Sequence, residues 1–316
     1  MKASESNSIN WKKIGIFLLI AYSFSWMTAL VMNWCGVDFD STTAIIIIAV
    51  FYMFGPALAA IIVQKYVYKE KLSTIGFNFD KSKLKGYLRI PFVFIALLFF
   101  CLAVIFSLGN LFQIPEFGVL DFSQENFNES LLNMIQSKAD IPVNKIPDLP
   151  VITLFFVFIL QGIISGFTIN IPIMFGEEFG WRGILLNEVK QLGFFKSSIF
   201  IGFFWGMWHL PLILIGLNYP NYPLTGILVM CLFTISISPL FSYLRIKLNF
   251  ILAPCILHGC INATGTIFVL YSRDGNELFS SIAGFSGSVA GFLTTFLFLF
   301  LIDKKFLLEY KNFQQQ

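Results

Sequence analysis

Residues 177–183 read Glu-Glu-Phe-Gly-Trp-Arg-Gly and stand where a long apolar run of the chain ends. Two adjacent carboxylates and an arginine are unusual beside such a run, because ionisable groups are costly inside a bilayer. The chain has two histidines, His209 and His258, and both lie within further apolar runs. We therefore expect the rest of the chain to form a membrane scaffold that gathers these polar side chains into one buried site.

The composition supports a membrane protein. Of the 316 residues, 57% are hydrophobic and 12% are charged, whereas soluble domains carry roughly 25% charged residues. Several apolar runs exceed the ~18–20 residues that a helix needs to cross a bilayer, and the ~10-residue alternating segments of spanning strands are not found. The fold class that we predict is all-α, a polytopic membrane helix bundle. About eight transmembrane helices are expected, at residues 14–35, 43–64, 90–112, 150–174, 197–217, 224–244, 250–272 and 281–302.

The distribution of basic residues predicts an orientation. With eight spans, 18 of the 21 Lys and Arg residues fall in segments on one side of the membrane, and the side rich in Lys and Arg is normally cytoplasmic. Both termini are therefore expected in the cytoplasm of a cell, most simply a bacterial one, with the protein integral and multi-pass in its membrane. Because the basic residues are scattered at helix ends, no nucleic-acid partner is expected.

The first polar motif lies on a helix of its own. Pro172 favours a new helix start, roughly over residues 172–192. On such a helix Glu178 and Arg182 are four residues apart and share a face, so they can pair. Glu177 is rotated by about 100° from Glu178 and stays outside that pair. We interpret Glu178 and Arg182 as a structural pair and Glu177 as the reactive carboxylate; the alternative is that both glutamates are interfacial anchors.

The two histidines are expected at similar depth. His209 is about 18 Å along its helix and His258 about 12 Å along its own, counted from the same side. Gly202 and Gly206 lie on the stripe of His209, and small residues let another helix approach closely. His258 and Asn262 share a helix face and could hold an oxyanion. Alternatively, Asn262 bonds to a neighbouring helix.

Three short motifs occur in order, namely Glu177-Glu178-x-x-x-Arg182, Trp205-x-x-x-His209 and His258-x-x-x-Asn262. They resemble the CAAX protease and bacteriocin-processing family of intramembrane peptidases (CPBP, also called Abi), which is similar to type II CAAX prenyl endopeptidases. Trp205 stands where that family usually has phenylalanine. The resemblance covers roughly residues 150–272. It divides one membrane domain (1–316) into three spans with an outer loop (1–149), a catalytic core (150–272), and a last span with a cytoplasmic tail (273–316).

The resemblance implies an intramembrane endopeptidase. Glu177 with His209 would activate a water molecule, and His258 with Asn262 would stabilise the oxyanion formed from a peptide carbonyl. The substrate would be a lipid-modified or amphipathic peptide, such as a CAAX-type C-terminus or a bacteriocin or pheromone precursor. It would reach the site from the cytoplasmic side, through a cavity open to the cytoplasm, while the lipid bilayer surrounds the protein.

The supporting side chains in this interpretation are Glu178, Arg182 and Trp205. A zinc-dependent version would use Glu177, His209 and His258 as ligands, with an open fourth position. We favour the version without a cofactor, because no two histidines share one helix at metalloprotease spacing.

Two alternatives of other classes remain. One is a non-catalytic membrane scaffold or bacteriocin self-immunity protein of the same fold. The other is a transporter that uses the buried histidines as a proton relay, against which the lack of an internal repeat argues. The long acidic loop at residues 113–149 suggests no particular role.

Overall fold

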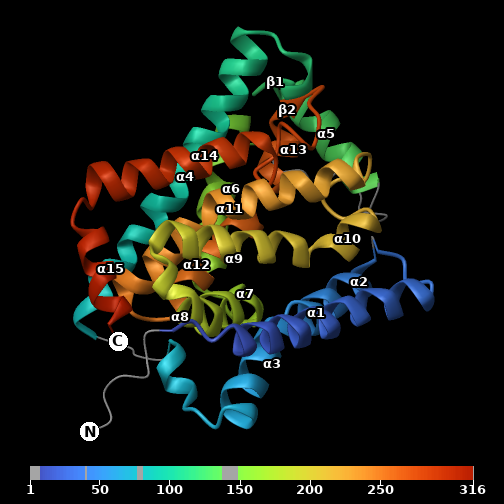
Figure 1. Ribbon diagram of the computed structural model, residues 1–316. Helices are drawn as coiled ribbons and strands as arrows, with labels where there is room; N and C mark the ends of the chain where they lie inside the picture. Colours follow the sequence, from blue (N-terminus) through green and yellow to red (C-terminus); the bar gives the residue numbers. More distant parts are fainter. Residues whose placement is uncertain (1–7, 40, 77–80, 137–148, 316) are drawn as a thin grey trace, which may run out of the picture.

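The chain folds into a bundle of helices, as the computed structural model shows for residues 8–39, 41–76, 81–136 and 149–315 (Figure 1). Among these described residues, six helices are long and apolar enough to cross a membrane: Trp11–Trp34, Thr42–Val67, Lys81–Leu111, Pro223–Leu248, Leu252–Leu270 and Phe285–Ile302. A seventh span is added if the bent pair Val151–Phe167 and Ile171–Leu192 is counted as one. The polytopic helical bundle is thus confirmed, while the count of eight and the cytoplasmic termini stay predictions.

The N-terminal part of the chain forms long helices that contain π-helical turns. Its elements are α1 (Trp11–Trp34), α2 (Thr42–Ile47), η1 (Ile48–Tyr52), α3 (Gly55–Ile61), η2 (Ile62–Val67), η3 (Leu72–Ile75), η4 (Lys81–Leu88), α4 (Arg89–Ile105), η5 (Phe106–Leu111), η6 (Pro115–Phe117), β1 (Val119–Leu120) and α5 (Gln124–Gln136). Helices suit a lipid environment because every backbone hydrogen bond is made within the segment. The rest of the predicted outer loop, residues 137–148, lies outside the described residues.

The C-terminal part holds all three motifs. Its elements are α6 (Val151–Phe167), α7 (Ile171–Glu178), η8 (Phe179–Leu185), α8 (Leu186–Val189), η9 (Lys190–Leu192), α9 (Phe194–Trp208), α10 (Leu210–Leu214), α11 (Pro223–Leu248), α12 (Leu252–Thr264), α13 (Thr266–Leu270), β2 (Ser272–Arg273), α14 (Phe285–Phe296), η10 (Leu297–Ile302) and α15 (Phe306–Gln314).

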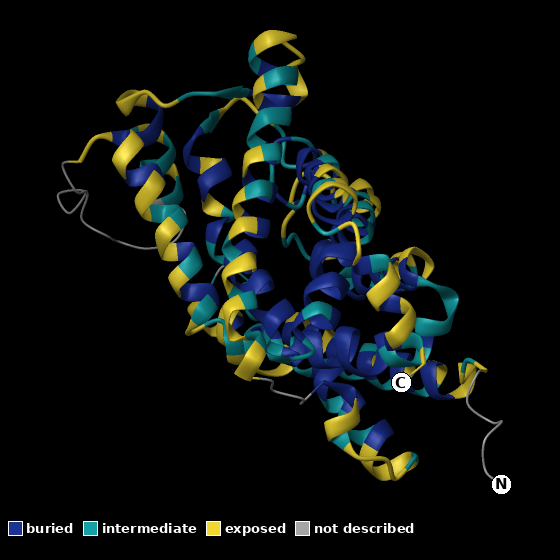
Figure 2. Cartoon of the chain, turned by 90° about the vertical axis from the view of Figure 1, so that its left-hand side faces the viewer, coloured by how far each residue is buried: buried dark blue, intermediate teal, exposed yellow. Residues whose placement is uncertain are grey.

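Helix α11 is central to the packing. It lies against α9 on one side and α14 on another, and it also contacts α12, which packs on α6. Figure 2 shows buried residues concentrated in the middle of the bundle and exposed ones along the outer helices. The outer helices α1 and α4 carry large exposed apolar side chains such as Leu19 and Phe99, as expected for faces that contact lipid.

The bundle has two distinct ends. At the end rich in lysine, Lys13 pairs with Glu70 and Glu188 at 2.6 and 2.8 Å, and Lys247 pairs with Asp303 at 2.9 Å. At the opposite end, β1 pairs antiparallel with β2. We call these the lysine-rich end and the strand end.

The predicted single helix at residues 197–217 is wrong, because the structure divides it at His209 into α9 and α10. The cause is Pro211, which has no backbone N–H to donate and whose ring clashes with the carbonyl four residues earlier. His209 therefore sits at the junction of two helices, where its side chain faces a cavity.

Candidate active site

The chain reaches the site through a sharp bend. Helix α6 ends at Phe167 and α7 begins at Ile171, with 63° between the two helices. The Asn170 side chain donates to the Gly259 carbonyl of α12 at 2.9 Å and anchors the bend. The predicted helix of separate register is confirmed, and the bend directs Glu177 and Glu178 into the bundle, where they are 2% and 0% exposed.

Two glycines let this helix approach α3 and the residues just before it. A Cβ added to Gly176 would lie 2.6 Å from the Met53 carbonyl oxygen, and one added to Gly180 would lie 2.8 Å from the Pro56 carbonyl oxygen. Atoms at these distances overlap, so only glycine allows this packing. The glutamate pair is thereby held deep in the bundle.

Glu178 and Arg182 form the predicted pair. Arg182 Nη1 lies 3.1 Å from Glu178 Oε2, and both side chains are fully buried. Arg182 Nη2 donates to Ser238 Oγ at 2.8 Å. The guanidinium lies 4.4 Å from the ring centre of Trp205 and 4.5 Å from that of Phe241. A buried charge needs such partners, so the pair has the contacts of a structural element.

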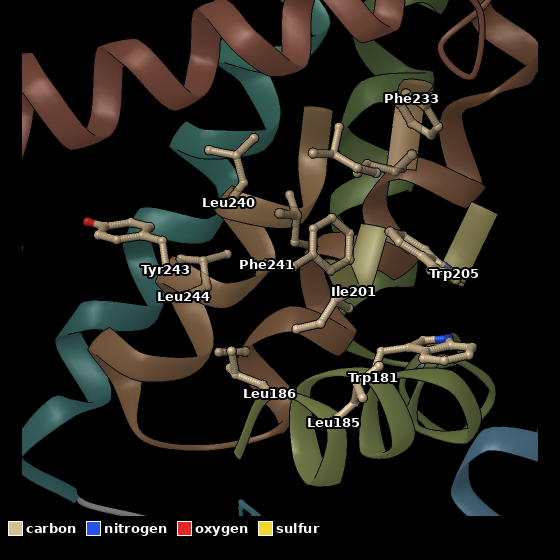
Figure 3. Close-up of a cluster of buried hydrophobic side chains, with 14 of the residues drawn as sticks. Trp181, Leu185, Leu186, Ile201, Trp205, Phe233, Leu240, Phe241, Tyr243 and Leu244 are labelled. Carbon is tan, nitrogen blue, oxygen red and sulfur yellow. The ribbon is translucent and has the colours of Figure 1, made fainter. Parts of the chain in front are cut away.

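Trp205 connects the other carboxylate to the first histidine. Its indole Nε1 donates to Glu177 Oε2 at 2.7 Å, and its backbone carbonyl lies 2.8 Å from His209 Nδ1. Because a carbonyl oxygen only accepts, His209 Nδ1 carries a proton and Nε2 is the basic nitrogen of the neutral ring. Trp205 thus fixes both groups predicted to activate water, and Figure 3 shows its ring beside Phe241 in the buried cluster.

His258 is held by Glu178. Its Nδ1 lies 3.0 Å from Glu178 Oε1, and its ring packs edge-on against Trp205 and Phe241, with ring centres 5.2 and 5.7 Å apart. Sequence spacing missed this bond and also missed Ser238 and Phe241. The available signal was the group of serines in the apolar run of α11, of which Ser238 lies three residues before Phe241.

A single cavity of about 510 Å³ joins the predicted residues. Its wall includes Glu177, Trp205, His209, His258 and Asn262. The two supporting residues of the buried pair are not part of the wall. The exposed Asn262 side chain donates to Met174 Sδ at 3.4 Å, which keeps its amide on the α7 side of the cavity.

The cavity extends to the strand end of the bundle. Beyond the site, its wall includes Ile45, Asn218 and Ala283, which lie in or near the connections at that end. At the other end the η8 residues 179–185 are all buried, and none of them is part of the cavity wall. The opening of the cavity to the cytoplasmic side stays a prediction.

The zinc alternative requires Glu177, His209 and His258 to surround one metal ion. Among the described residues, no three His, Cys, Asp or Glu side chains lie in an arrangement that could hold a metal ion. Glu177, His209 and His258 line one cavity but are not gathered around a common point. We therefore derive no step through a metal ion.

Comparisons with known proteins point to one family. Residues 147–264 match the family model described as Rce1-like, type II CAAX prenyl endopeptidase. A 44-residue stretch is 43% identical to CAAX prenyl protease 2 of Methanococcus maripaludis and covers 14% of this chain and 16% of that protein. Residues 147–264 contain all three motifs, so the resemblance predicted from these motifs is confirmed. This part of the multi-pass membrane protein is an Rce1-like segment.

Proposed function

We propose that this protein is an intramembrane endopeptidase. The observation that supports this most is the shared cavity, in which a carboxylate, two imidazoles and an amide face one space of about 510 Å³. An Rce1-like match over residues 147–264 supports the same class of activity. Every group that the proposal uses lies on α7, α9 or α12 or at their ends.

In the proposed reaction, Glu177 and His209 activate a water molecule in the cavity. The water oxygen attacks the peptide carbonyl carbon, and its proton passes to Glu177 or to Nε2 of His209. The tetrahedral intermediate collapses when the C–N bond breaks and the stored proton passes to the leaving nitrogen. The products are a new carboxyl terminus and a new amine, and the two side chains return to their starting states.

The negative oxygen of the intermediate would be stabilised by His258 and Asn262. Since Nδ1 of His258 faces the Glu178 carboxylate, donation from Nε2 requires the ring to carry both protons, with Glu178 as its counter-charge. The Asn262 amide supplies a neutral donor. Hydrogen-bond donors positioned in advance at such a site typically contribute a factor of about 10²–10³ in kcat.

The cavity wall supports an apolar peptide as substrate. Between the site and the strand end it is lined by Ile48, Met230, Phe233 and Ile237. These side chains suit a lipid-modified or amphipathic peptide, such as a CAAX-type C-terminus or a bacteriocin or pheromone precursor. A polar, fully solvated peptide would lose its hydration there without gaining partners.

The test is cleavage of a panel of prenylated and leader-type peptides by the purified protein. Glu177→Gln is expected to lower kcat/KM by at least about 10³, because the residue takes part in the bond-breaking step. Glu309→Gln is the matched control, since Glu309 is 45% exposed and pairs with Lys247 at the lysine-rich end. Equal activity of Glu177→Gln and wild type would refute the catalytic role of Glu177.

The same assay separates the remaining alternatives. Loss of wild-type cleavage with a strong chelator, restored by zinc, would assign the reaction to a metallopeptidase. Absence of cleavage by the wild type on every peptide, while the protein is folded, would favour the scaffold or self-immunity alternative.

A further inference from the structure

Arg245 is a buried charge that forms no ion pair with any other described residue. It lies in the last turn of α11, at the lysine-rich end, and its side chain is 3% exposed. Its Nε and Nη1 atoms have no hydrogen-bond partner among the described residues. Buried charged groups are nearly always paired, and each unpaired one calls for a missing partner such as an ion.

A second pocket adjoins this guanidinium. It has a volume of about 200 Å³ and is lined by Arg245 together with Gln64, Thr74, Asn187 and Lys190. It shares no wall residue with the cavity of the candidate active site. The Gln64 Oε1 atom is also buried without a partner among the described residues, so the wall has unused polar groups.

A glycine lets the backbone pass close to the guanidinium. Gly76 has φ +137°, and a Cβ placed on it would lie 3.2 Å from both Nε and Nη2 of Arg245. Few side chains tolerate that backbone conformation. The backbone thus passes close to Arg245 without giving it a hydrogen-bond acceptor.

The charges around the pocket leave a positive excess. Glu70 and Glu188 line it, but each already binds Lys13 Nζ, at 2.6 and 2.8 Å. Among the described residues, Lys13, Arg245 and Lys190 are thus three cations against these two carboxylates. An additional anion at Arg245 would therefore be balanced.

We propose that this pocket binds a phosphate group through Arg245, with Lys190 at the rim. The planar guanidinium presents a fork of donors that matches two phosphate oxygens. The end of a spanning helix is also the depth at which lipid phosphates lie. The phosphate belongs either to an anionic phospholipid or to a soluble phosphate, and both present the same chemistry to Arg245.

The test measures thermal unfolding of the delipidated full-length protein in detergent. One arm adds inorganic phosphate, with chloride at equal ionic strength as reference. The other adds phosphatidylglycerol, with diacylglycerol of the same chains as reference. At saturation, at least one arm is expected to raise the wild-type midpoint by roughly 3 °C or more. A shift in the lipid arm alone identifies a headgroup, and a shift in the phosphate arm identifies a soluble phosphate.

Variants assign the effect to the pocket. Arg245→Gln is expected to abolish the shift, whereas Arg89→Gln should keep it, because Arg89 is at the same end, 44% exposed and paired with Asp303. If Arg245→Gln does not fold, Lys190→Gln replaces it and is expected to weaken binding about threefold. The proposal is overturned if neither ligand raises the unfolding midpoint of the wild type. It is also overturned if a folded Arg245→Gln or Lys190→Gln variant shows the full wild-type shift.

Discussion

Glu178 contacts His258 Nδ1 at 3.0 Å while it pairs with Arg182 at 3.1 Å. Helical spacing predicts the arginine contact, four residues away, but His258 is 80 residues further along the chain. One fully buried carboxylate therefore serves both a structural charge and a side chain of the cavity wall. Removing that carboxylate should affect folding and chemistry together.

Glu178→Gln is expected to destabilise the protein by roughly 3–5 kcal/mol, because it leaves Arg182 as an uncompensated buried charge. The double variant Glu178→Gln/Arg182→Met should recover part of that loss, since the guanidinium that lost its partner is removed as well. Equilibrium unfolding in mixed micelles measures both. Strict additivity of Glu178→Gln and Arg182→Met would contradict the coupling.

Trp205→Phe should lower kcat/KM about tenfold without abolishing cleavage. The variant removes the indole donor to Glu177, worth about 1.5–3 kcal/mol for a charged partner, but it keeps the backbone carbonyl that binds His209. Trp181→Phe is the control, because Trp181 is buried and its Nε1 has no partner among the described residues. Steady-state kinetics on one peptide should show a rate change in the first variant only.

Asn262→Ala is expected to reduce kcat by about 10²–10³ with little change in KM, as for loss of a donor used mainly in the transition state. Asn187→Ala serves for comparison, since its amide donates to the Thr74 carbonyl outside the cavity. A large rise in KM with unchanged kcat would instead mean that Asn262 binds the ground state.

Gly206→Ala should cost roughly 1–3 kcal/mol of stability. A Cβ there would lie 2.6 Å from the Cys231 Cα atom of α11, so the two helices would have to separate. Gly15→Ala, in a helix position with nothing within 4 Å, should be neutral or stabilising by up to about 1 kcal/mol. Chemical unfolding of both variants makes the comparison, and equal effects would rule out close packing at Gly206.

The orientation and the cavity make a joint prediction about thiol labelling in intact cells. In a Cys35→Ser background, Asn218→Cys reports the accessibility of the cavity at the strand end, which we call its mouth. Lys12→Cys reports the accessibility of the lysine-rich end. If the charge bias sets the orientation, a membrane-impermeant reagent should modify only Asn218→Cys. Modification of Lys12→Cys alone would reverse the orientation and place the mouth on the cytoplasmic side.

Much of the architecture follows from sequence patterns. Six of the eight predicted apolar runs coincide with helices long and apolar enough to cross a membrane. The start of α7 next to Pro172 and the Glu178–Arg182 pair at four-residue spacing are also confirmed in the structure. The stripe of Gly202 and Gly206 likewise marks where α11 approaches α9. These features are local, so periodicity and backbone chemistry are enough to predict them.

The contacts between distant segments could not be predicted in this way. Examples are the Glu178–His258 hydrogen bond and the two hydrogen bonds that Trp205 makes, one to Glu177 and one to His209. These bonds depend on how α7, α9 and α12 are rotated relative to one another. The cavity wall likewise combines side chains from helices that are far apart in the sequence, such as Ile45, Glu177 and His258. The assigned roles of Glu177, His209, His258 and Asn262 stay predictions.

The depth of the candidate site below the strand end sets a minimum length for any extended peptide that reaches it. From Ile45 near the mouth to Tyr52 beside the site, the helix rises about 10 Å, which an extended peptide covers in about three residues. A scissile bond would need at least that much unfolded chain between it and any bulky domain. Under the proposed function, the protein would cleave flexible ends and leave folded proteins intact, whatever their sequence.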